Sequence, residues 1–419
     1  MTQDFFDYLK ERGYVYQVTN EDEVRKILNS DKPITFYLGI DPTADSLHIG
    51  HFVSLMMFRH LQRKGHRGIL VIGGATALVG DPTGKSDMRK MLTNEAVARN
   101  VAEVKELASH FIRLDGENPA MILDNSEWIN AFNYVEFMRL VGTHFNVNKM
   151  LASEAYSKRL ENGGLTFLEM GYMLMQAYDF VHLNRTYGCA LEIGGSDQWG
   201  NIVAGTELSR KMNFHLEGKS TDERPDAFGL TCPLLMTKEG KKMGKTESGT
   251  LWVARDKTTP FTFYQYFYNT DDADTEKLLK LFTDIPTSEI EDLCRTDIIQ
   301  AKKRMAYEVT KLVHGEEEAQ KAIEAAQSLF GKGTNMDNVP TAEFDSARLT
   351  TGINIVDLSA ELGFFASKGE ARRMIQQGGF SVNGEKVTSI DTIIQLSADE
   401  QEVLLQKGKK NFLRVKKSA

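Results

Sequence analysis

The sequence has few cysteines and no long apolar run, and each absence excludes a class of protein. Its three cysteines, Cys189, Cys232 and Cys294, are widely spaced and form no Cys-x-x-Cys pair. Since no histidine cluster accompanies them, we expect neither a metal site nor a disulfide framework. No run reaches the roughly 18 apolar residues of a membrane span, and the first ten residues lack the apolar core of a signal peptide. We therefore expect a cytoplasmic protein without a membrane span.

The chain also lacks an excess of basic residues. It has 50 Lys+Arg against 58 Asp+Glu, a net charge of -8, which argues against a protein that coats nucleic acid along its whole surface. The charge is unevenly distributed, because the tail from Lys407 onward has six basic residues and no acidic one. With 419 residues, 41% of them hydrophobic, the chain is long enough for two or three domains. We predict an acidic body followed by a small basic module.

Short apolar runs alternate with helical patterns in the first half of the chain. Two segments, residues 51–64 and 94–111, have the apolar spacing of helices. This alternation predicts an α/β fold, a Rossmann-like doubly wound parallel sheet, whose ligands bind beyond the carboxyl ends of its strands. We expect functional residues directly after each run. The runs are residues 34–40, 68–73, 120–123 and 189–193.

The later part of the chain predicts separate domains. After a catalytic domain over residues 1–250, helical patterns such as 277–282 and 301–330 indicate a helical domain over 251–330. Residues 331–350 contain Gly, Asn and Pro with weak periodicity and are predicted to be a linker.

A small α+β module over residues 351–419 completes the predicted order. Ser367 with Glu370 predicts a capping box at the start of a helix that runs to Gln377. Asn383-Gly384, between two short β-type runs, is a strong hairpin signal.

Two histidines follow the first apolar run. That run contains Gly39 and leads into a loop with Asp41, and His48 and His51 stand at the first turn of the next helix. We expect imidazoles and free backbone N–H groups to point at one place there, which suits an anion. Gly50 lies between the histidines and leaves room for a bulky ligand to approach the backbone. Capping or packing is the alternative for a single histidine, and the pair favours the functional interpretation.

The segment from Gly80 to Ser86 looks at first like a nucleotide-binding P-loop. A P-loop needs glycine at position 79, where Val79 stands, so the spacing rejects that interpretation. Asp81 in this loop contacts a substrate cation or is an ordinary turn residue, and the sequence leaves both interpretations open.

Three polar residues, Tyr172, Gln176 and Asp179, stand at i, i+4 and i+7 and share one helix face. A solvent-exposed face is the usual meaning of such a pattern. Here that face has no Lys, Arg or Glu, and its hydrogen-bonding groups suit a small polar ligand in a pocket.

Two further segments have residues suited to nucleotides. Gly195, Asp197 and Gln198 follow the last apolar run, where glycine permits close backbone approach and Asp197 is placed to bond ribose hydroxyls; a tight structural turn is the alternative. Lys242 and Lys245, with Thr246, belong to a glycine-containing segment predicted to be a mobile loop. A lysine run is usually solvated surface, but two ammonium groups also stabilise a developing pyrophosphate.

In this order, the segments resemble the class I aminoacyl-tRNA synthetases. The His-Ile-Gly-His signature matches residues 48–51, and the Lys-Met-Ser-Lys-Ser signature matches residues 242–246, with Gly244 and Thr246 in place of the two serines. Tyr37, Asp41, the helix with Asp179 and the run at 194–201 resemble the bacterial tyrosyl-tRNA synthetase family. The C-terminal module resembles the ribosomal-protein-type RNA-binding domain of that family.

The resemblance implies a homodimeric enzyme that joins L-tyrosine to ATP, with Mg2+ on the phosphates, and then transfers tyrosine to tRNA(Tyr). ATP is a substrate, and no tightly bound organic cofactor is expected. The implied tyrosine site has Tyr37 and Asp179 at the phenol, Gln198 near the carboxylate, and Asp81, Tyr172 and Gln176 at the α-ammonium group. The implied catalytic residues, which stabilise the transition state and the pyrophosphate, are His48, His51, Lys242, Lys245 and Thr246. The implied ATP site comprises Gly39, Asp41, His48, Gly50, His51, Gly195, Asp197 and Lys245.

Two alternative functions are to be weighed, and two positions differ from the pattern expected of the family. A tryptophanyl-tRNA synthetase shares both signatures, but the phenol-binding pair and the C-terminal module argue against it. A non-catalytic RNA-binding descendant would lose the active-site side chains, which are present here. Glu192 stands where the family is expected to have glutamine, and Leu38 where a small polar residue is common; both could alter nucleotide affinity or the local charge balance.

Overall fold

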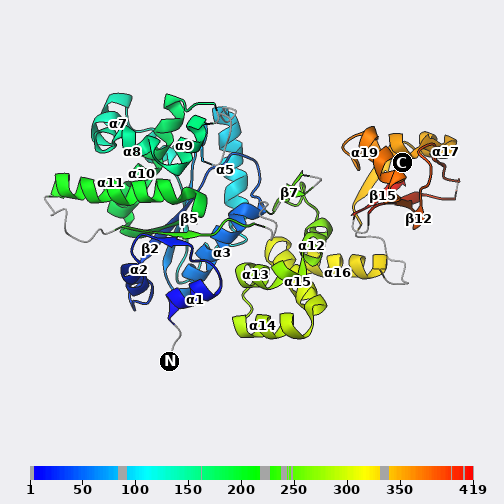
Figure 1. Cartoon of the computed structure of the whole chain (residues 1–419), viewed down its shortest axis with the longest axis horizontal. Coiled ribbons are helices and arrows are strands. Elements are labelled where there is room, and N and C mark those ends of the chain that lie inside the picture. Colours follow the sequence, from blue (N-terminus) through cyan, green and yellow to red (C-terminus); the bar gives the residue numbers. More distant parts are fainter. Residues whose placement is uncertain are drawn as a thin grey trace. The chain divides into compact units, whose positions relative to one another are not determined.

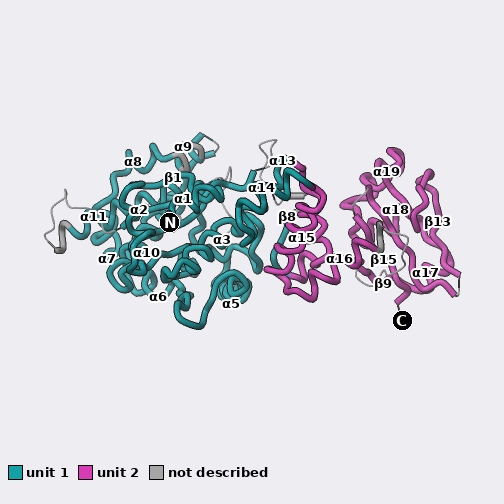
Figure 2. The backbone as a smooth tube through the Cα atoms, turned by 90° about the horizontal axis from the view of Figure 1, so that it is seen from below, with its two compact units in different colours: residues 1–246, 250–254, 273–296 teal, residues 247–249, 255–272, 297–419 magenta. Residues whose placement is uncertain are grey.

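The computed structural model describes residues 4–83, 92–161, 163–217, 227–236, 243, 245–246, 249–330, 339–397, 399–408 and 411–418. The chain forms two compact units, which Figure 2 shows in different colours. Unit 1 comprises residues 1–246, 250–254 and 273–296, and unit 2 comprises the rest.

Unit 1 is built on a six-stranded sheet with the order β1-β6-β5-β2-β3-β4. Its last five strands in this order are mutually parallel, and β1 lies antiparallel to β6 at one edge. The four predicted runs are confirmed as β2 to β5, whereas β1 and β6 were missed. The strands are β1 (Gln17–Val18), β2 (Thr35–Ile40), β3 (Arg67–Ile72), β4 (Met121–Asp124), β5 (Cys189–Gly195) and β6 (Phe228–Cys232).

The two missed strands have weak local signals. β6 is buried along its length but contains Gly229 and Thr231, which dilute an apolar run. β1 has two residues and exists because it pairs with β6, through Gln17–Thr231 and Val18–Leu230. Their pairing is a tertiary effect, which local propensity does not report.

The strand order reverses between β2 and β5. From β2 the chain proceeds outward through β3 and β4, and from β5 it proceeds the other way to β6. Such a reversal opens a crevice at the carboxyl ends of the two central strands. Helix α3 (Ile49–Lys64) lies on one side of the sheet, and α10 (Phe167–Tyr187) and α11 (Trp199–Glu217) lie on the other (Figure 1).

The other helices of unit 1 surround this framework, and the predicted helix at 94–111 ends three residues early, at Ala108. They are α1 (Phe5–Glu11), α2 (Glu21–Leu28), α4 (Thr76–Val79), α5 (Asn94–Ala108), α6 (Ser126–Ile129), α7 (Tyr134–Leu140), α8 (Val147–Leu151), α9 (Glu154–Glu161), α13 (Asp272–Phe282) and α14 (Thr287–Thr296), with 3-10 turns at Gly142–His144 and Ser196–Gln198.

Unit 2 begins with a helical part, which differs from prediction in one respect. The expected helix over 301–330 is two helices, α15 (Ile298–His314) and α16 (Glu316–Phe330), because Gly315 between them has φ +87. A residue in this left-handed region ends an α-helix. Helix α12 (Pro260–Tyr268) packs against both.

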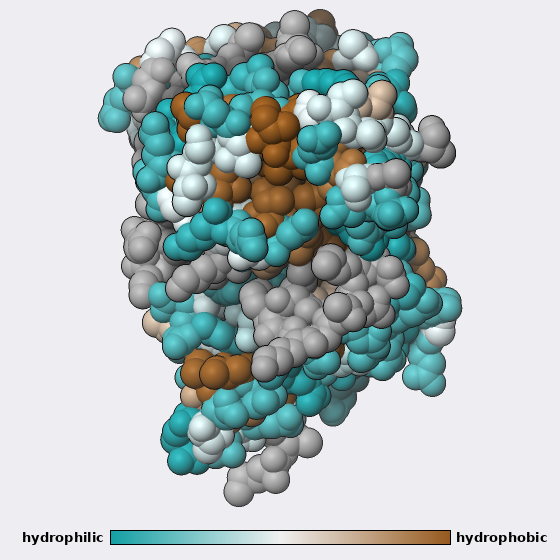
Figure 3. Space-filling model, turned by 90° about the vertical axis from the view of Figure 1, so that its right-hand side faces the viewer, coloured by the Kyte–Doolittle hydropathy of each residue, from teal (hydrophilic) through white to brown (hydrophobic). Residues whose placement is uncertain are grey.

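The C-terminal part of unit 2 has its own apolar core, which includes Leu358, Ile375 and Phe380. Its five-stranded sheet has the order β12-β11-β14-β15-β9. Figure 3 shows an apolar area framed by hydrophilic residues on the face of this module that is turned toward the viewer. Its elements are β9 (Thr341–Phe344), α17 (Ser346–Thr351), β10 (Ile353–Asn354), α18 (Ile355–Glu361), α19 (Lys368–Gln376), β11 (Phe380–Val382), β12 (Glu385–Lys386), β13 (Ile393–Ile394), β14 (Glu402–Lys407) and β15 (Asn411–Lys417).

The module confirms the predicted hairpin and corrects the linker. Asn383 and Gly384 have φ 48 and 85, as a tight two-residue hairpin turn requires. Part of the predicted linker over 331–350 is regular structure, since β9 pairs in parallel with β15 and α17 begins at Ser346. That pairing joins segments about 70 residues apart in the chain, so the local pattern does not reveal it.

A buried arginine anchors the N-terminal helix to a distant segment of unit 1. Arg12 is 2% exposed and follows α1 directly. Its guanidinium group donates to the backbone carbonyls of Lys280 at 2.8 Å, Thr283 at 2.7 Å and Ile285. Because these carbonyls follow or end α13, the arginine satisfies acceptors that the helix itself leaves open. The segment 273–296 is therefore held within unit 1.

We predict that Arg12→Met destabilises unit 1 by about 2–4 kcal/mol, because methionine fills the space but leaves buried carbonyls without a donor. Urea unfolding followed by circular dichroism measures this. Arg25→Met is the matched control, since Arg25 pairs with Asp4, Asp7 and Glu21 near the surface and lies over the Phe6 ring, so its replacement leaves no buried carbonyl without a donor and should cost less. Equal losses in the two variants would contradict the anchor.

Candidate active site

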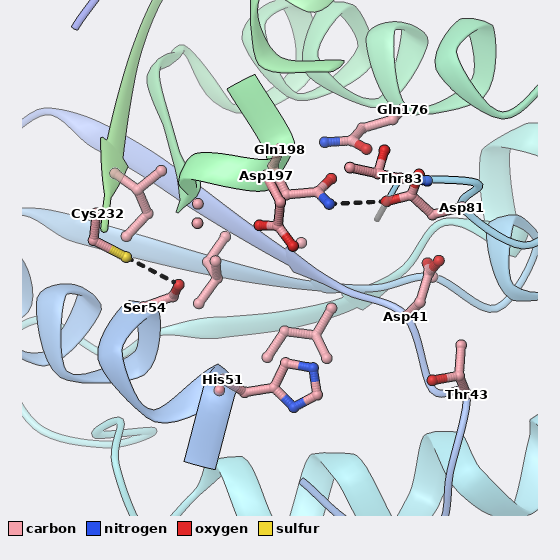
Figure 4. Close-up of a pocket in the computed structure, with 18 of the residues that line it drawn as sticks. Asp41, Thr43, His51, Ser54, Asp81, Thr83, Gln176, Asp197, Gln198 and Cys232 are labelled. Carbon is pink, nitrogen blue, oxygen red and sulfur yellow. Dashed lines mark hydrogen bonds between the residues drawn. The ribbon is translucent and has the colours of Figure 1, made fainter. Parts of the chain in front are cut away.

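The crevice between β2 and β5 contains a cavity of about 630 Å3. Every predicted site residue whose side chain the structure describes lines this cavity. In Figure 4, Gln176, Asp197, Gln198 and Asp81 lie above the space, His51 lies below it, and Asp41 lies at the right between Asp81 and Thr43. The predicted residues in its lining are Tyr37, Gly39, Asp41, His48, Gly50, His51, Asp81, Tyr172, Gln176, Asp179, Gly195, Asp197 and Gln198.

The lysine segment is only partly described. Lys242 lies outside the described residues, and for Lys245 and Thr246 the structure gives the backbone alone, as strand β7 (Lys245–Thr246). Met243 lines the cavity, and its N–H donates to the carbonyl of Leu235 at 2.9 Å.

The two histidines stack face to face at the start of α3. Their ring centroids are 3.9 Å apart, with the planes 10° from parallel. Nδ1 of His48 accepts from the N–H of Gly50 at 3.0 Å, and Nδ1 of His51 accepts from the N–H of His48 at 3.4 Å. A neutral imidazole that accepts at Nδ1 carries its proton on Nε2. Both rings therefore have an Nε2–H donor on the side away from the helix backbone.

The expectation of free backbone N–H groups at this helix start was wrong. The N–H of Ile49 donates to the carbonyl of Leu251 at 3.3 Å, that of Gly50 to His48, and that of His51 to the carbonyl of His48 at 2.9 Å. Imidazole groups thus replace the backbone as the donors of this turn. Gly50 lines the cavity and has a further role at this turn, because a Cβ there would lie 2.8 Å from the His48 ring.

Tyr37 and Asp179 are both buried in the cavity wall. Asp179 accepts from Nε1 of Trp128 at 2.7 Å and from Nδ2 of Asn125 at 3.0 Å. Burial raises the pKa of Asp179 to about 8, against the lowering effect of these two bonds. The hydroxyl of Tyr37 is buried and makes no hydrogen bond of normal geometry within the protein, and burial, together with the neighbouring Glu192 carboxyl group, raises the pKa of this phenol well above its ordinary value. A buried polar atom of this kind needs a partner from a ligand or from water.

A second carboxylate is connected to Asp179 through side chains. Asp41 accepts from the hydroxyl of Tyr172 at 2.9 Å and from that of Thr76 at 2.7 Å. Nδ2 of Asn125 lies 3.1 Å from the Thr76 hydroxyl oxygen, to which it donates, and it also donates to Asp179. Both carboxylates are consequently fixed in place by one hydrogen-bonded network.

Asp81 is a turn residue that also lines the cavity. Its carboxylate accepts from the N–H of Thr83 at 2.9 Å, as in an Asx turn, and from Nε2 of Gln198 at 2.8 Å. Gln198 in turn accepts from Nδ2 of Asn201 at 3.1 Å. The turn is therefore real, and the carboxylate still lines the cavity.

The helix face of Tyr172, Gln176 and Asp179 is confirmed as a cavity wall. Nε2 of Gln176 donates to Glu192 on β5 at 3.0 Å. Glu192 is 2% exposed, and burial raises the pKa of its carboxyl group to about 7. The departure at position 192 thus places a further carboxyl group inside the cavity.

The lining contains five carboxyl groups and, among its described residues, no Lys or Arg. The five are Asp41, Asp81, Asp179, Glu192 and Asp197. Such a lining favours a ligand with a positive group, whereas a polyphosphate needs cations from elsewhere. The cavity can therefore bind a cationic ligand together with a polyphosphate only when basic side chains or metal ions from outside this lining balance the phosphate charge.

Sequence reasoning missed several residues of this site. Asn125 follows β4 directly, so the rule that functional residues come after each run would have included it. Trp128 had no local signal, because only the fold brings its N–H to Asp179. Ser54 and Cys232 also line the cavity and lie 3.4 Å apart, Oγ to Sγ (Figure 4).

Comparison with known proteins identifies the family. The model for class I tRNA synthetases (W and Y) matches residues 29–331, and the tyrosine–tRNA ligase SYY-like C-terminal domain matches residues 333–415. A tyrosine–tRNA ligase of Clostridium tetani is 51% identical over 419 residues, or 99% of each chain. The chain belongs to the tyrosine–tRNA ligase family. A relative in this family from Acetivibrio thermocellus is 49% identical over 98% of both chains.

Solved structures agree with membership of the tyrosine–tRNA ligase family. A C-terminally truncated mitochondrial tyrosyl-tRNA synthetase of Aspergillus nidulans is 30% identical, with a TM-score of 0.69, and the match covers 78% of this chain and 94% of that one. A tryptophanyl-tRNA synthetase of Encephalitozoon cuniculi has a TM-score of 0.53 at 15% identity, over 75% of this chain and 87% of that one, and shares the fold alone. The predicted class I fold and the predicted enzyme class, an aminoacyl-tRNA ligase, are confirmed.

We predict that Glu192→Gln stabilises the folded protein as pH rises. The folded pKa of about 7 exceeds the ordinary value of 4.5, so the folded state holds a proton that the unfolded chain releases, and wild-type stability falls between these pH values. Glutamine keeps an acceptor for Gln176 and does not ionise, so the variant does not lose this stability as pH rises. Urea unfolding should show a gain of up to about 3 kcal/mol near pH 8 and little near pH 4. A gain independent of pH would contradict this origin.

Proposed function

We propose that the cavity between β2 and β5 is where this member of the tyrosine–tRNA ligase family joins L-tyrosine to ATP, forming tyrosyl-AMP and pyrophosphate. Tyrosine then passes to the 3′ end of tRNA(Tyr). No covalent enzyme intermediate is involved. Catalysis rests on positioning and on electrostatic stabilisation of the phosphate charge.

One observation carries the choice of amino acid. The buried Tyr37 hydroxyl makes no hydrogen bond of normal geometry within the protein, and the group that it interacts with, Glu192, has only acceptors once ionised. It shares the cavity with Asp179, whose carboxylate is oriented by Asn125 and Trp128. A substrate phenol can donate to Asp179 and bond with Tyr37, whereas a phenylalanine ring would leave both groups unpaired. Unpaired buried groups give strong discrimination, for which tyrosyl-tRNA synthetases are themselves the standard example.

The other end of tyrosine fits the remaining carboxylates. We propose that Asp81, Tyr172 and Gln176 hold the α-ammonium group and that Gln198 lies near the carboxylate. Asp81 and the Asp41 next to Tyr172 supply negative charge there, which matches a cation. The absence of Lys and Arg from the described lining supports this assignment.

The ATP phosphates require donors, which the histidines and the lysine segment would supply. We propose that His48 and His51 donate from Nε2 to the phosphates and that Lys242, Lys245 and Thr246 stabilise the leaving pyrophosphate. Mg2+ would neutralise phosphate charge as part of the ATP complex; among the described residues no group of three or more His, Cys, Asp or Glu could itself hold a metal ion.

The adenosine part would lie along the glycines of β2 and β5. A Cβ at Gly39 would meet nothing within 4 Å and would occupy open cavity space, and one at Gly195 would lie 2.7 Å from Asp197. We propose that Gly39, Asp41, Gly50 and Gly195 admit the nucleotide and that Asp197 bonds its ribose.

We propose the domain division of a catalytic domain at 1–250, a helical domain at 251–330 and a tRNA-binding module at 351–419, to which β9 and α17 of the predicted linker segment 331–350 also belong. The module has ten basic residues, six of them from Lys407 onward, which suits the phosphate backbone of an RNA. We further propose a cytoplasmic location. Among the described helices, none combines the length and apolar character that crossing a membrane requires.

Exposed apolar side chains on α7, α8 and α10 support a homodimer. Tyr134 and Val135 are 67% and 61% exposed, Val147 is 54% exposed, and Phe167 is 69% exposed. Other side chains of these three helices pack in one apolar cluster. The exposed residues are therefore carried by helices that pack together. Apolar groups of this size at the surface of a monomer are typical of an interface. We propose that this surface pairs two copies of the chain.

The function is tested by tyrosine-dependent exchange of pyrophosphate into ATP. We expect exchange with tyrosine and not with tryptophan, and we expect Tyr37→Phe to lower kcat/KM for tyrosine about tenfold, because one hydrogen bond to the substrate is lost. Tyr156→Phe is the matched control, since that buried hydroxyl bonds the carbonyl of Met170 outside the cavity. Exchange driven by tryptophan alone would refute the specificity, and no exchange with either would refute the enzyme.

The dimer surface is tested by Phe167→Asp. We expect this variant to sediment as a monomer at micromolar concentration, because a desolvated carboxylate replaces an apolar contact. Tyr16→Asp is the control, since Tyr16 is 62% exposed but precedes β1 in the chain and belongs to none of the helices α7, α8 and α10. Monomers in both variants, or dimers in both, would contradict the assignment.

A further inference from the structure

Glu192 and Gln176 form a hydrogen-bonded pair in the cavity wall. Nε2 of Gln176 donates to Oε1 of Glu192 at 3.0 Å. Both side chains line the cavity, and Glu192 is 2% exposed. The other acceptors of the pair, Oε1 of Gln176 and Oε2 of Glu192, are buried and accept no hydrogen bond of normal geometry, although the Glu192 carboxyl group interacts with the Tyr37 hydroxyl. The pair therefore leaves two buried acceptor oxygens without a donor, and no donor of the pair is left unsatisfied.

An ionised carboxylate removes the ambiguity of an amide. A glutamine side chain can point either its carbonyl oxygen or its NH2 group in a given direction, and its neighbours decide between the two. A carboxylate is an acceptor only, so it attracts the NH2 group of Gln176 and repels the carbonyl oxygen. Glutamine at position 192 could accept from Gln176 or donate to it, and both orientations would then be populated.

We propose that Glu192 is a positioning residue that fixes the amide of Gln176 with its carbonyl oxygen toward the α-ammonium group of bound tyrosine. This inference rests on the proposed function of the cavity, in which Gln176 holds that ammonium group. Glu192 touches Gln176 and need not touch the substrate ammonium itself. Glutamate at position 192 thus contributes to recognition of the cationic end of the substrate.

The position of Glu192 in the sheet is consistent with this role. It lies opposite Tyr37 in the register of β5 and β2, and a Cβ at Gly205 on α11 would lie 3.3 Å from its Oε2. The side chain is therefore confined by a neighbouring strand and a helix. A confined carboxylate loses little rotamer freedom when it orders Gln176.

The test uses three ligands and calorimetric binding to the full chain without ATP. L-tyrosine has both charged groups, tyramine keeps only the ammonium, and 3-(4-hydroxyphenyl)propanoate keeps only the carboxylate. We expect Glu192→Gln to weaken tyrosine and tyramine by about tenfold each, the value of one hydrogen bond to a charged group. Binding of the propanoate should change less than about twofold, because it lacks the group that Gln176 recognises.

A matched control separates this effect from loss of stability. Glu169→Gln makes the same chemical change at a carboxyl group that is also 2% exposed but pairs with Arg159 and does not line the cavity. This variant should leave the ratio of the three affinities unchanged. If Glu192→Gln weakens all three ligands equally, or none of them, the positioning role is refuted.

The pH dependence of the ratio of the affinities for tyrosine and for the propanoate gives a second readout. The titratable groups that interact with Glu192 are Tyr37 on β2, Asp179 on α10 and Cys189 on β5. Tyr37 and Asp179 face the phenol, which both ligands share, so their effect cancels in the ratio of tyrosine to propanoate. Burial raises the pKa of Glu192 to about 7, so its acceptor-only form increases as pH rises from 6 to 8. Relative to the glutamine variant, wild-type preference for tyrosine should increase over this range, and a constant difference would overturn the proposal.

Failure of this inference is distinguishable from failure of the proposed function. Pyrophosphate exchange with tyrosine tests the reaction, and ligand binding without ATP tests the recognition of the ammonium group. Exchange without the ligand-specific effect would leave the function standing and refute the role of Glu192. Ligand-specific binding without exchange would do the opposite.

Discussion

The site depends on holding several carboxyl groups inside one protein cavity that has, among its described residues, no lysine or arginine to pair with them. Desolvation of such groups is costly, and neutral donors compensate for it. Asn125 and Trp128 donate to Asp179, Tyr172 and Thr76 donate to Asp41, and the side-chain amides of Gln198 and Gln176 donate to Asp81 and Glu192. Several of these donors come from α4, α6, α10 and the loop after β4. The hydrogen bonds to the carboxyl groups therefore depend on how these elements pack in the sheet domain. A change in either disturbs both.

Much of this arrangement was predictable from the sequence, because the signals were local. Runs of apolar residues predicted four central strands, and the spacing of Tyr172, Gln176 and Asp179 predicted a polar face turned inward. The short edge strand β1 and the pairing of β9 with β15 were not predictable, since both depend on distant partners. The role of Trp128 belongs to the same class, because its N–H reaches Asp179 only through the fold.

At the helix start at His48, the sequence predicted the position of the site correctly but predicted backbone N–H groups among the donors, which was wrong. The general rule for helix N-termini is that backbone N–H groups are left open. Here the first imidazole caps its own helix, and Gly50 makes this possible because any Cβ would press against the ring. The motif thus exchanges weak, fixed backbone donors for side-chain donors whose charge state changes with protonation.

The anchor of Arg12 has a consequence for how the chain is made. Its carbonyl partners lie around Lys280 and Ile285, so the N-terminal helix cannot complete its contacts until about 270 further residues have left the ribosome. At the usual speed of synthesis, roughly 5–20 residues per second, this delay lasts on the order of tens of seconds. During that interval the sheet domain has an open apolar edge where α13 and α14 will pack. Nascent chains of this enzyme are therefore expected to be clients of ribosome-associated chaperones.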